Sequence, residues 1–352
     1  MTPKTRNGFK KTVLITGGAG FIGSNFVRHL YHKYPDYQLL VLDALTYAGN
    51  VENLPQDGLK NNRFRFWYGN VRNAELVDTL VSQSDIVVHF AAESHVTRSI
   101  FDNLIFFETD VIGTQVVTNA VLKYMKQIDR FIHISTSEVY GSAKAEKMAE
   151  DTHPLDPTTP YASAKAGADR LVYSYCATYD IPAVIIRPFN NYGPYQHLEK
   201  VVPRFITSCL LDEPLTVHGE GQSSRDWVFV EDCCAALDRV LHVDLEKVRG
   251  QVINIGTGRS LDVATIAQTV IERMGKPKSL IQYTNERPGQ VVRHTAFVEK
   301  AKRLLGWEAQ TRFEEGLDRT IAWYTQNRKW WERQLWLRHI PTVAQDGHIE
   351  LH

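Results

Sequence analysis

Apolar runs of strand length alternate with segments of helical spacing over the first two thirds of the chain. Seven runs are predicted to be strands: 12–16, 38–43, 63–68, 86–90, 131–136, 182–187 and 251–255. Most are continuously apolar, which is typical of parallel strands that are covered on both faces. Helical spacing is found in 23–33, 103–126, 161–179 and 230–243. The pattern predicts an α/β fold, namely a Rossmann-type doubly wound parallel sheet with helices on each side.

The pattern loosens after residue 188, where Pro, Gly and aromatic residues cluster between short strands. Single cores stop growing at roughly 250–300 residues, so a chain of this length favours two coupled units. We expect residues 1–188 to form a dinucleotide-binding domain that is completed by about 230–258. Residues 189–229 and 259–330 are expected to form a smaller, interleaved C-terminal substrate domain. The tail, 331–352, is aromatic and charged, and no pattern assigns it a role.

The composition restricts the partners and the location. The 40 Lys and Arg residues balance 40 Asp and Glu residues, so no nucleic-acid partner is expected. Apolar runs fall well short of the roughly 20 residues of a membrane helix, and the first is too short for a signal peptide. A cytoplasmic protein without membrane attachment is the simplest interpretation. The four cysteines have neither C-x-x-C spacing nor a paired His motif, so no metal site is expected, and Cys233 and Cys234 are predicted to be buried in a helix.

A glycine motif follows the first predicted strand and begins a helix. Gly17, Gly20 and Gly23 form G-x-x-G-x-x-G. The first permits a tight turn, the second lets backbone approach a pyrophosphate at a helix N-terminus, and the third allows close helix–strand packing. Such a triplet alone also occurs in ordinary turns. However, Asp43 ends the next strand, where an acid accepts the ribose hydroxyls of NAD and repels the extra phosphate of NADP. The pair predicts an NAD site.

Other cofactor contacts are expected near the glycine motif and at the ends of the following strands. Phe21 and Ile22 lie inside the motif itself. Asn70 follows the third strand, where it is placed to contact adenine. Ala91 and Ala92 end the fourth strand, and their small side chains would let backbone lie against the cofactor.

The candidate catalytic residues come from a strand end and a helix start. Thr136, Ser137 and Glu138 end the fifth strand, where ligands bind in open α/β sheets. Tyr161 and Lys165 have i,i+4 spacing and share one helical face. An ammonium beside a phenol favours the phenolate, and a cationic nicotinamide adds to this, so the pKa of Tyr161 is expected to fall from about 10 toward neutrality. Such a Tyr removes a hydroxyl proton while hydride leaves the same carbon.

The Y-x-x-x-K spacing is common, and by itself a packed Tyr with a solvated Lys explains it. Its combination with the glycine motif and the acid of the second strand favours catalysis.

These residues carry a resemblance to the extended short-chain dehydrogenase/reductase superfamily, and within it most closely to the dTDP-glucose 4,6-dehydratase family. The matching segments include ITGGAGFIGSNFVRHL, HFAAESHVTRSI, STSEVYG, PTTPYASAKAGAD, IIRPFNNYGPYQ and GEGQSSRDWVFVEDC, within about residues 12–310. The resemblance implies NAD as cofactor and conversion of a nucleoside-diphosphate hexose to its 4-keto-6-deoxy product. It also implies a homodimer, in which 103–126 and 161–179 form a four-helix bundle with their copies. A buried face within one chain explains their apolar content equally well.

The resemblance also implies the roles of individual residues. Tyr161 takes the O4 proton while the C4 hydride passes to NAD, and Thr136 hydrogen-bonds O4. Glu138 matches the general base that removes the C5 proton as the C6 hydroxyl leaves, after which hydride returns to C6. A structural hydrogen bond is the simpler alternative for Glu138. The implied substrate-binding residues are Ser94, Thr136, Asn190, Glu199, Lys200, Arg225 and Arg287.

The resemblance places Asn190 and Arg225 at the pyrophosphate, with Arg287 nearby, and guanidinium groups bind paired phosphate oxygens well. Surface salt bridges are the alternative for Arg225 and Arg287. The base of the nucleotide stays open, since the thymine methyl is worth only about 1–3 kcal/mol in a pocket.

Two departures from the family pattern leave alternatives open. Ser137 stands where dTDP-glucose dehydratases have the Asp that acts as general acid, and Thr97 stands where they usually have Asp. A Ser hydroxyl is far too weak an acid to replace Asp directly, although it can relay a proton or position a water. GDP-mannose 4,6-dehydratases share Thr-Ser-Glu and still dehydrate, but UDP-glucuronate decarboxylases carry a similar segment. A decarboxylase, a 4-epimerase and a non-catalytic dinucleotide sensor therefore stay as alternatives. Against a decarboxylase, 190–196 and Glu199-Lys200 resemble the dehydratase version.

Overall fold

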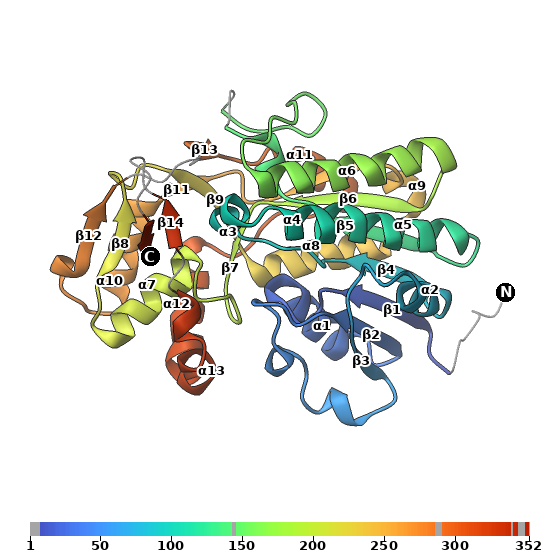
Figure 1. Cartoon of the computed structure of the whole chain (residues 1–352), viewed down its shortest axis with the longest axis horizontal. Coiled ribbons are helices and arrows are strands. Elements are labelled where there is room, and N and C mark those ends of the chain that lie inside the picture. The colour runs from blue at the N-terminus through green and yellow to red at the C-terminus, as the bar shows by residue number, and fades with distance from the viewer. Residues whose placement is uncertain (1–7, 143–145, 286–290, 339–340, 344–348, 352) are drawn as a thin grey trace.

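A parallel sheet of seven strands forms the centre of the molecule, in the order β10-β6-β5-β4-β1-β2-β3 (Figure 1). The computed structural model describes residues 8–142, 146–285, 291–338, 341–343 and 349–351. The strands of this sheet are β1 (Lys11–Thr16), β2 (Tyr37–Asp43), β3 (Phe64–Tyr68), β4 (Ile86–His89), β5 (Arg130–Ile134), β6 (Ala183–Pro188) and β10 (Val252–Ile255). All seven predicted strands are confirmed, with ends that differ by one or two residues. The order reverses between β1 and β4, and ligands bind at such a reversal in open α/β sheets.

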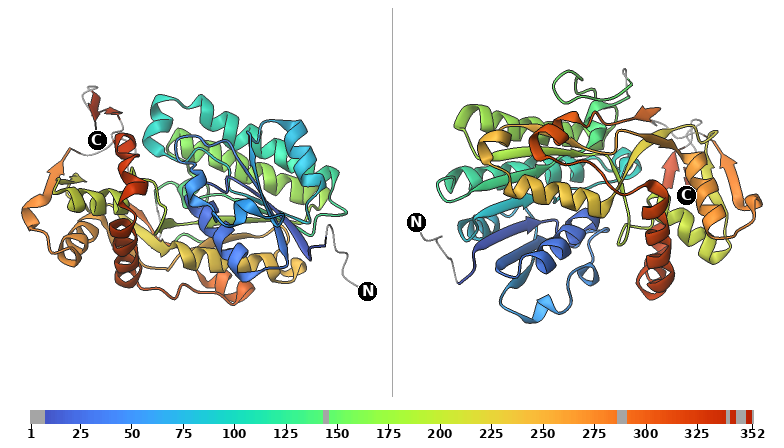
Figure 2. Two further views of the ribbon diagram at one scale, coloured as in Figure 1. Left: turned by 90° about the horizontal axis from the view of Figure 1, so that it is seen from below. Right: turned by 180° about the vertical axis from the view of Figure 1, so that it is seen from behind.

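Helices cover both faces of the sheet, because side chains of each strand point alternately to either side (Figure 2). Val13 and Ile15 of β1 enter the core beneath α1 and α8, whereas Leu14 enters the core beneath α2, α5 and α6. The doubly wound α/β prediction is therefore correct. The covering helices are α1 (Phe21–Lys33), α8 (Val230–His242) and α11 (Glu299–Leu305) on one face, and α2 (Ala74–Ser82), α5 (Thr114–Lys123) and α6 (Pro160–Tyr179) on the other.

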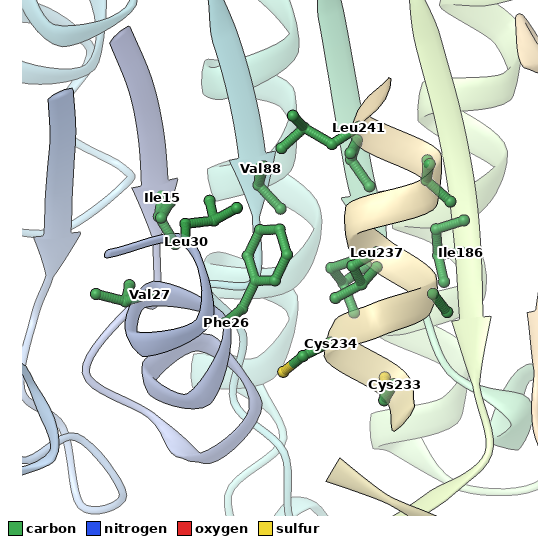
Figure 3. Close-up of a cluster of buried hydrophobic side chains, with 14 of the residues drawn as sticks. Ile15, Phe26, Val27, Leu30, Val88, Ile186, Cys233, Cys234, Leu237 and Leu241 are labelled. Carbon is green, nitrogen blue, oxygen red and sulfur yellow. The ribbon is translucent and has the colours of Figure 1, made fainter. Parts of the chain in front are cut away.

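The buried face of α8 contains Cys233 and Cys234, which lie close to Leu237 and across from Phe26 of α1 (Figure 3). Each of the two cysteines is 1% exposed, and both are free thiols. The prediction that they are small buried apolar side chains is confirmed. Burial raises the pKa of both thiols, Cys233 to about 12, so neither is a reactive thiolate.

The predicted helix over 103–126 is interrupted in its middle. A short α4 (Leu104–Phe106) leads into a π-helical stretch, Phe107–Gly113, before α5 begins. π-Helical turns are found frequently at functional sites because they change the direction of a few side chains. Here the stretch contains Asp110, a fully buried carboxyl whose Oδ1 accepts from the Glu93 N–H at 2.8 Å. Apolar periodicity does not reveal such a local change in winding.

Smaller sheets lie beyond the carboxyl edge of the main sheet. In one of them, β9 pairs with β7, β11 and β13, and in another β8 pairs with β12. A separate apolar core joins them to four further helices. The predicted domain boundaries remain a prediction. The elements are β7 (Asn190–Tyr192), α7 (Val201–Leu211), β8 (Leu215–His218), β9 (Ser224–Phe229), β11 (Ser260–Asp262), α10 (Val263–Arg273), β12 (Ile281–Thr284), β13 (Arg293–His294), α12 (Phe313–Gln326) and α13 (Arg328–Glu332).

None of the helices in the described ranges is long and apolar enough to cross a bilayer. The remaining elements are α3 (Val96–Phe101), α9 (Leu245–Val248), β14 (Pro341–Val343), β15 (Ile349–Leu351), the π-helical stretch named above, and the short 3-10 helices Val51–Asn53, Gly58–Lys60, Ser137–Tyr140, Lys278–Leu280 and Leu335–Arg338.

The start of the C-terminal tail has a packing role that the sequence did not reveal. Trp331 is fully buried, and the guanidinium of Arg338 donates to the Ser208 hydroxyl at 2.8 Å. Just before them, Trp330 Nε1 donates to Asn53 Oδ1 at 2.9 Å, and Asn53 Nδ2 donates at 2.9 Å to the carbonyl of Ala19 in the glycine motif. Trp330 therefore braces, through Asn53, the glycine turn that the sequence assigns to the cofactor.

Replacing Trp330 by Phe should test this brace, because it keeps an aromatic ring and deletes the N–H donor. The loss leaves the buried Asn53 amide one partner short, so we expect the free energy of unfolding to fall by about 1–3 kcal/mol. NAD should also bind more weakly, as measured by titration calorimetry. Trp336→Phe is the matched control, since Trp336 is 72% exposed. Equal melting temperatures and NAD affinities for the two variants would contradict the brace.

Candidate active site

A cavity of about 370 Å³ lies at the carboxyl ends of the strands, beside the reversal in strand order. It brings together segments that are far apart in sequence, from the glycine motif to residue 200. Its lining includes every residue predicted to contact the cofactor: Gly17, Gly20, Phe21, Ile22, Gly23, Asp43, Asn70, Ala91, Ala92, Tyr161 and Lys165. Of the other predicted site residues, it includes Ser94, Thr136, Ser137, Glu138, Asn190, Glu199 and Lys200.

The glycine motif has the shape of an anion cradle. Gly17 has φ +68°, and a Cβ there would lie 2.5 Å from the backbone N of Ala91. A Cβ on Gly23 would lie 2.3 Å from the Gly17 carbonyl, so helix and turn meet backbone to backbone. Gly20 differs, since a Cβ there meets only the Gly17 carbonyl, at an ordinary 3.4 Å, and it lines the cavity. Helix α1 begins there without a side-chain cap, which leaves N–H groups for a phosphate.

Asp43 connects the end of β2 to this cradle. Its Oδ2 accepts from the Ala19 N–H at 2.8 Å and its Oδ1 from the Leu45 N–H at 2.8 Å. Burial raises the pKa of Asp43, and the hydrogen bonds from Leu45, Ala19 and Gly20 oppose that rise. The carboxyl group both orders the turn and lines the cavity. Together with the cradle, these residues fit NAD.

Helix α6 presents Tyr161 and Lys165 to the cavity from its first turns. Thr159 caps the helix by accepting from the Ala162 N–H at 3.2 Å, and Pro160 occupies the first turn, where its missing N–H costs nothing. Lys165 Nζ donates to the Ile134 carbonyl at the end of β5, at 2.7 Å. The helix is thereby joined to the strand end that holds the other catalytic candidates.

In the chain by itself the pKa of Tyr161 is raised, and the expected fall, which included a cationic nicotinamide, stays a prediction. Burial raises its pKa, the carboxylates of Asp110 and Glu138 raise it further, and only a hydrogen bond with Thr136 lowers it. The Lys165 ammonium is directed to a carbonyl instead, and burial lowers its own pKa against the opposing effects of Asp110 and Asp169. The expectation took the ammonium into account, but the sequence showed neither the burial of Tyr161 nor the nearby Asp110 of the π-helical stretch.

The strand end at 136–138 turns directly into a short 3-10 helix, Ser137–Tyr140. Thr136 Oγ1 caps it by accepting from the Glu138 N–H at 3.2 Å. Glu138 is partly exposed to the cavity, with 18% of its side chain accessible. Ser137 is buried, and its Oγ lies 3.5 Å from Nδ1 of His294. That imidazole is the polar group behind this pair, and the sequence analysis did not identify it.

A second polar cluster lies at the other end of the cavity and is centred on Glu199. Its fully buried carboxylate is 3.1 Å from the Tyr47 hydroxyl, 3.2 Å from Arg98 Nε and 3.6 Å from Lys200 Nζ. Burial raises the pKa of Glu199, but His95, Lys200, His197 and Arg98 outweigh it and bring the pKa to about 2. Glu199 is thus a fixed anion that positions the cations around it. The family resemblance identified Glu199 and Lys200 but not Tyr47 or Arg98.

The two arginines assigned to the pyrophosphate have different outcomes. Arg225 on β9 donates to the Ser223 hydroxyl and the Ser224 carbonyl, both at 2.9 Å, and does not line the described cavity. In register it pairs with His294 of β13. Arg287 lies outside the described residues, so its expected contact is untested. The described residues contain no group of three or more His, Cys, Asp or Glu side chains placed to hold a metal ion.

The fold and the cavity agree with comparisons to known proteins. Residues 14–320 match the GDP-mannose 4,6 dehydratase family. The chain is 46% identical over 312 residues to the low-salt glycan biosynthesis protein Agl12 of Haloferax volcanii, covering 89% of this chain and 98% of that protein. It is 41% identical over 325 residues to a dTDP-glucose 4,6-dehydratase of Streptomyces niveus, covering 91% and 94% of the two chains.

A solved structure shows the same likeness. The double mutant of DesIV, a dTDP-glucose 4,6-dehydratase from Streptomyces venezuelae crystallised with NAD bound, superposes with a TM-score of 0.86 at 40% identity. The match covers 92% of this chain and 99% of that one. The predicted superfamily is therefore confirmed: this chain belongs to the GDP-mannose 4,6 dehydratase family of extended short-chain dehydrogenases/reductases.

Proposed function

We propose that this protein is an NAD-dependent nucleotide-sugar 4,6-dehydratase, a carbon–oxygen lyase. The observation that carries the proposal is Glu138, a cavity-facing carboxyl beside the Tyr161–Lys165 helix. Oxidation at C4 alone, as in an epimerase, has no use for a second base, whereas elimination needs one to remove the C5 proton. The relatives named dTDP-glucose 4,6-dehydratase support the same reaction and suggest dTDP-glucose as substrate.

The residues divide the reaction between them. Tyr161 takes the O4 proton. Thr136, which is hydrogen-bonded to Tyr161, holds the O4 atom beside the phenol. Lys165 donates to the Ile134 carbonyl and so holds the start of α6 against the strand end that carries Thr136. NAD, which the glycine motif and Asp43 would hold, would supply the acceptor of the C4 hydride and its donor to C6. Glu138 removes the C5 proton, which the C4 ketone acidifies, and later returns a proton to C5.

The opposite end of the cavity would hold the rest of the substrate. Asn190, Ser94 and Lys200 line it, and Lys200 Nζ donates to the Ser94 carbonyl at 3.0 Å. Lys200 and Arg98 supply positive charge that suits the diphosphate or the sugar hydroxyls, while the buried Glu199 keeps them in place. Arg225 and Arg287 remain proposed contacts of the pyrophosphate.

Product mass decides between the dehydratase and its alternatives. Purified protein is incubated without added NAD with dTDP-glucose, UDP-glucose, GDP-mannose and UDP-glucuronate in turn. We expect loss of water from one of the hexose substrates. Loss of carbon dioxide from UDP-glucuronate would identify the decarboxylase, the alternative that Ser137 leaves open. An unchanged mass with inverted configuration at C4 would identify the epimerase. No turnover of any of the four would contradict the proposal.

We also propose a homodimer formed through α3, α4, the π-helical stretch and α6. Large apolar side chains are exposed there in a group that a monomer would leave in water. They are Ile100 (42%), Phe101 (42%), Leu104 (63%), Phe107 (41%), Ile112 (48%) and Tyr173 (45%).

Leu104→Glu should convert the dimer to a monomer, since it places a charge in the middle of an apolar interface. Light scattering coupled to size-exclusion chromatography measures the mass. Tyr283→Glu is the control, because Tyr283 is 56% exposed on β12 and should leave the dimer intact. A wild-type protein that elutes as a monomer would disprove the interface.

A further inference from the structure

Ser137 and Glu138 share an imidazole neighbour that the reaction described above does not use. His294 on β13 is fully buried and lies outside the cavity lining, directly behind the two residues. Its Nδ1 is 3.5 Å from Ser137 Oγ and 3.7 Å from Glu138 Oε1. Catalytic hydrogen bonds are often this long before substrate binds and shorten in the complex.

The other ring nitrogen determines which proton His294 can move. Nε2 lies 2.7 Å from the Gly141 carbonyl. Because a carbonyl only accepts, Nε2 keeps its proton in every charge state. Gain and loss of a proton therefore occur at Nδ1, the atom that faces the two catalytic side chains. This is the arrangement of a histidine that exchanges protons at one defined position.

The elimination step has a need that the cavity-facing residues do not meet. When the C5 proton goes to Glu138, the electron pair of that bond forms the C5–C6 double bond and the C6–O bond breaks. The departing oxygen then needs a proton. Ser137 is at the right place but is far too weak an acid to give one up unaided.

We propose that His294 supplies this proton through the Ser137 hydroxyl. Ser137 O–H passes its proton to the departing C6 oxygen and takes one from Nδ1–H of the imidazolium, so water leaves and His294 becomes neutral. The serine is unchanged, no electrons are gained or lost, and His294 regains a proton from solvent before the next turnover. His294 acts through Ser137 and is a positioning and proton-supplying residue. The inference rests on the proposed dehydratase reaction.

The surroundings of His294 determine the expected pH dependence. Burial lowers the pKa of His294; Arg225 on β9 and the nearby His153 lower it further, while Glu138 and the hydrogen bond to Gly141 raise it. A ring of Phe189 packs on it edge-on. The imidazolium, and with it the rate of elimination, should therefore increase as the pH falls through this lowered pKa. This increase in rate at acidic pH should vanish when residue 294 has no titratable side chain.

His294→Gln is the test variant, because a glutamine amide can still donate to Gly141 and keep the local fold. With dTDP-glucose, we expect oxidation to persist, elimination to slow by about 10²-fold, and bound reduced nicotinamide to accumulate in the near-ultraviolet spectrum. The acidic increase of the wild-type rate should disappear. His153→Gln is the matched control, since it removes the neighbouring imidazole without touching Ser137. It should keep elimination and the acidic increase of the rate, with that increase moved to higher pH because His153 lowers the pKa of His294.

Two further measurements separate proton supply from a structural role. Ser137→Asp, added to His294→Gln, provides an acid at the cavity and should restore elimination. The substrate dTDP-6-deoxy-6-fluoroglucose loses fluoride, which needs no proton. The wild type and His294→Gln should therefore turn it over at similar rates. Wild-type rate and pH profile in His294→Gln would overturn the inference, as would an equal deficit with the fluoro substrate. Failure of the wild type to dehydrate dTDP-glucose would instead refute the proposed function with this substrate.

Discussion

Replacing Tyr161 by Phe should lower the rate of C4 oxidation by about 10²–10⁴-fold, the usual contribution of a positioned proton acceptor. The ring of Tyr161 packs against Phe106 with its centroid 6.1 Å away, and phenylalanine keeps that contact, so the fold should be retained. No reduced nicotinamide should form on addition of dTDP-glucose, as followed by its near-ultraviolet absorbance. NAD and substrate binding, measured by calorimetry, should change little.

A second readout separates Tyr161 from Glu138. The 4-keto product, dTDP-4-keto-6-deoxyglucose, already has an acidified C5 proton, so its exchange in heavy water needs only the C5 base. Tyr161→Phe should therefore exchange this proton at the wild-type rate. Tyr179→Phe, at the exposed end of α6, is the control for loss of a hydroxyl. Unimpaired C4 oxidation in Tyr161→Phe would remove the phenol from the mechanism.

Replacing Glu138 by Gln should have the opposite result. Glutamine occupies the same space and cannot accept the C5 proton, so dehydration should fall by about 10²–10⁴-fold. Oxidation at C4 should continue because Tyr161, Thr136 and Lys165 remain. Reduced nicotinamide and the bound ketone should therefore accumulate, which rapid quenching and mass spectrometry can detect.

The same variant should lose exchange at C5 of the ketone product, which makes the two substitutions complementary. Glu150→Gln is a matched control, because Glu150 is a largely buried carboxyl that accepts from the Asn254 N–H at 2.7 Å and does not line the cavity. Dehydration at the wild-type rate in Glu138→Gln would leave the carboxylate with only the structural role that the sequence analysis kept as an alternative.

The cofactor half of the site was predictable because it is local. Few residues other than glycine fit the φ of +68° at position 17 or the close backbone contact at position 23. Asp43 is the last residue of a predicted strand, so its position could be read from the sequence. The polar half was predictable only where the residues adjoin a recognisable motif, as Ser137 and Glu138 adjoin Thr136. His294 is 157 positions from Ser137, and no spacing rule connects residues on elements that become neighbours only in the fold.

The sequence by itself determined the seven-stranded sheet, the turn that fits a dinucleotide and the identity of the Tyr, Lys and Glu that line the cavity. The sheet follows from a repeating apolar pattern and the turn from a short backbone requirement. The Tyr and Lys follow from their i,i+4 spacing, and the role of the Glu follows from resemblance to a known family. Only the tertiary structure decided how these groups are tuned: burial and Asp110 raise the pKa of Tyr161, two cations and two histidines around Glu199 lower its pKa, and an imidazole lies behind Ser137. Burial and electrostatic interactions act through space between distant segments, so they exist only once the chain has folded.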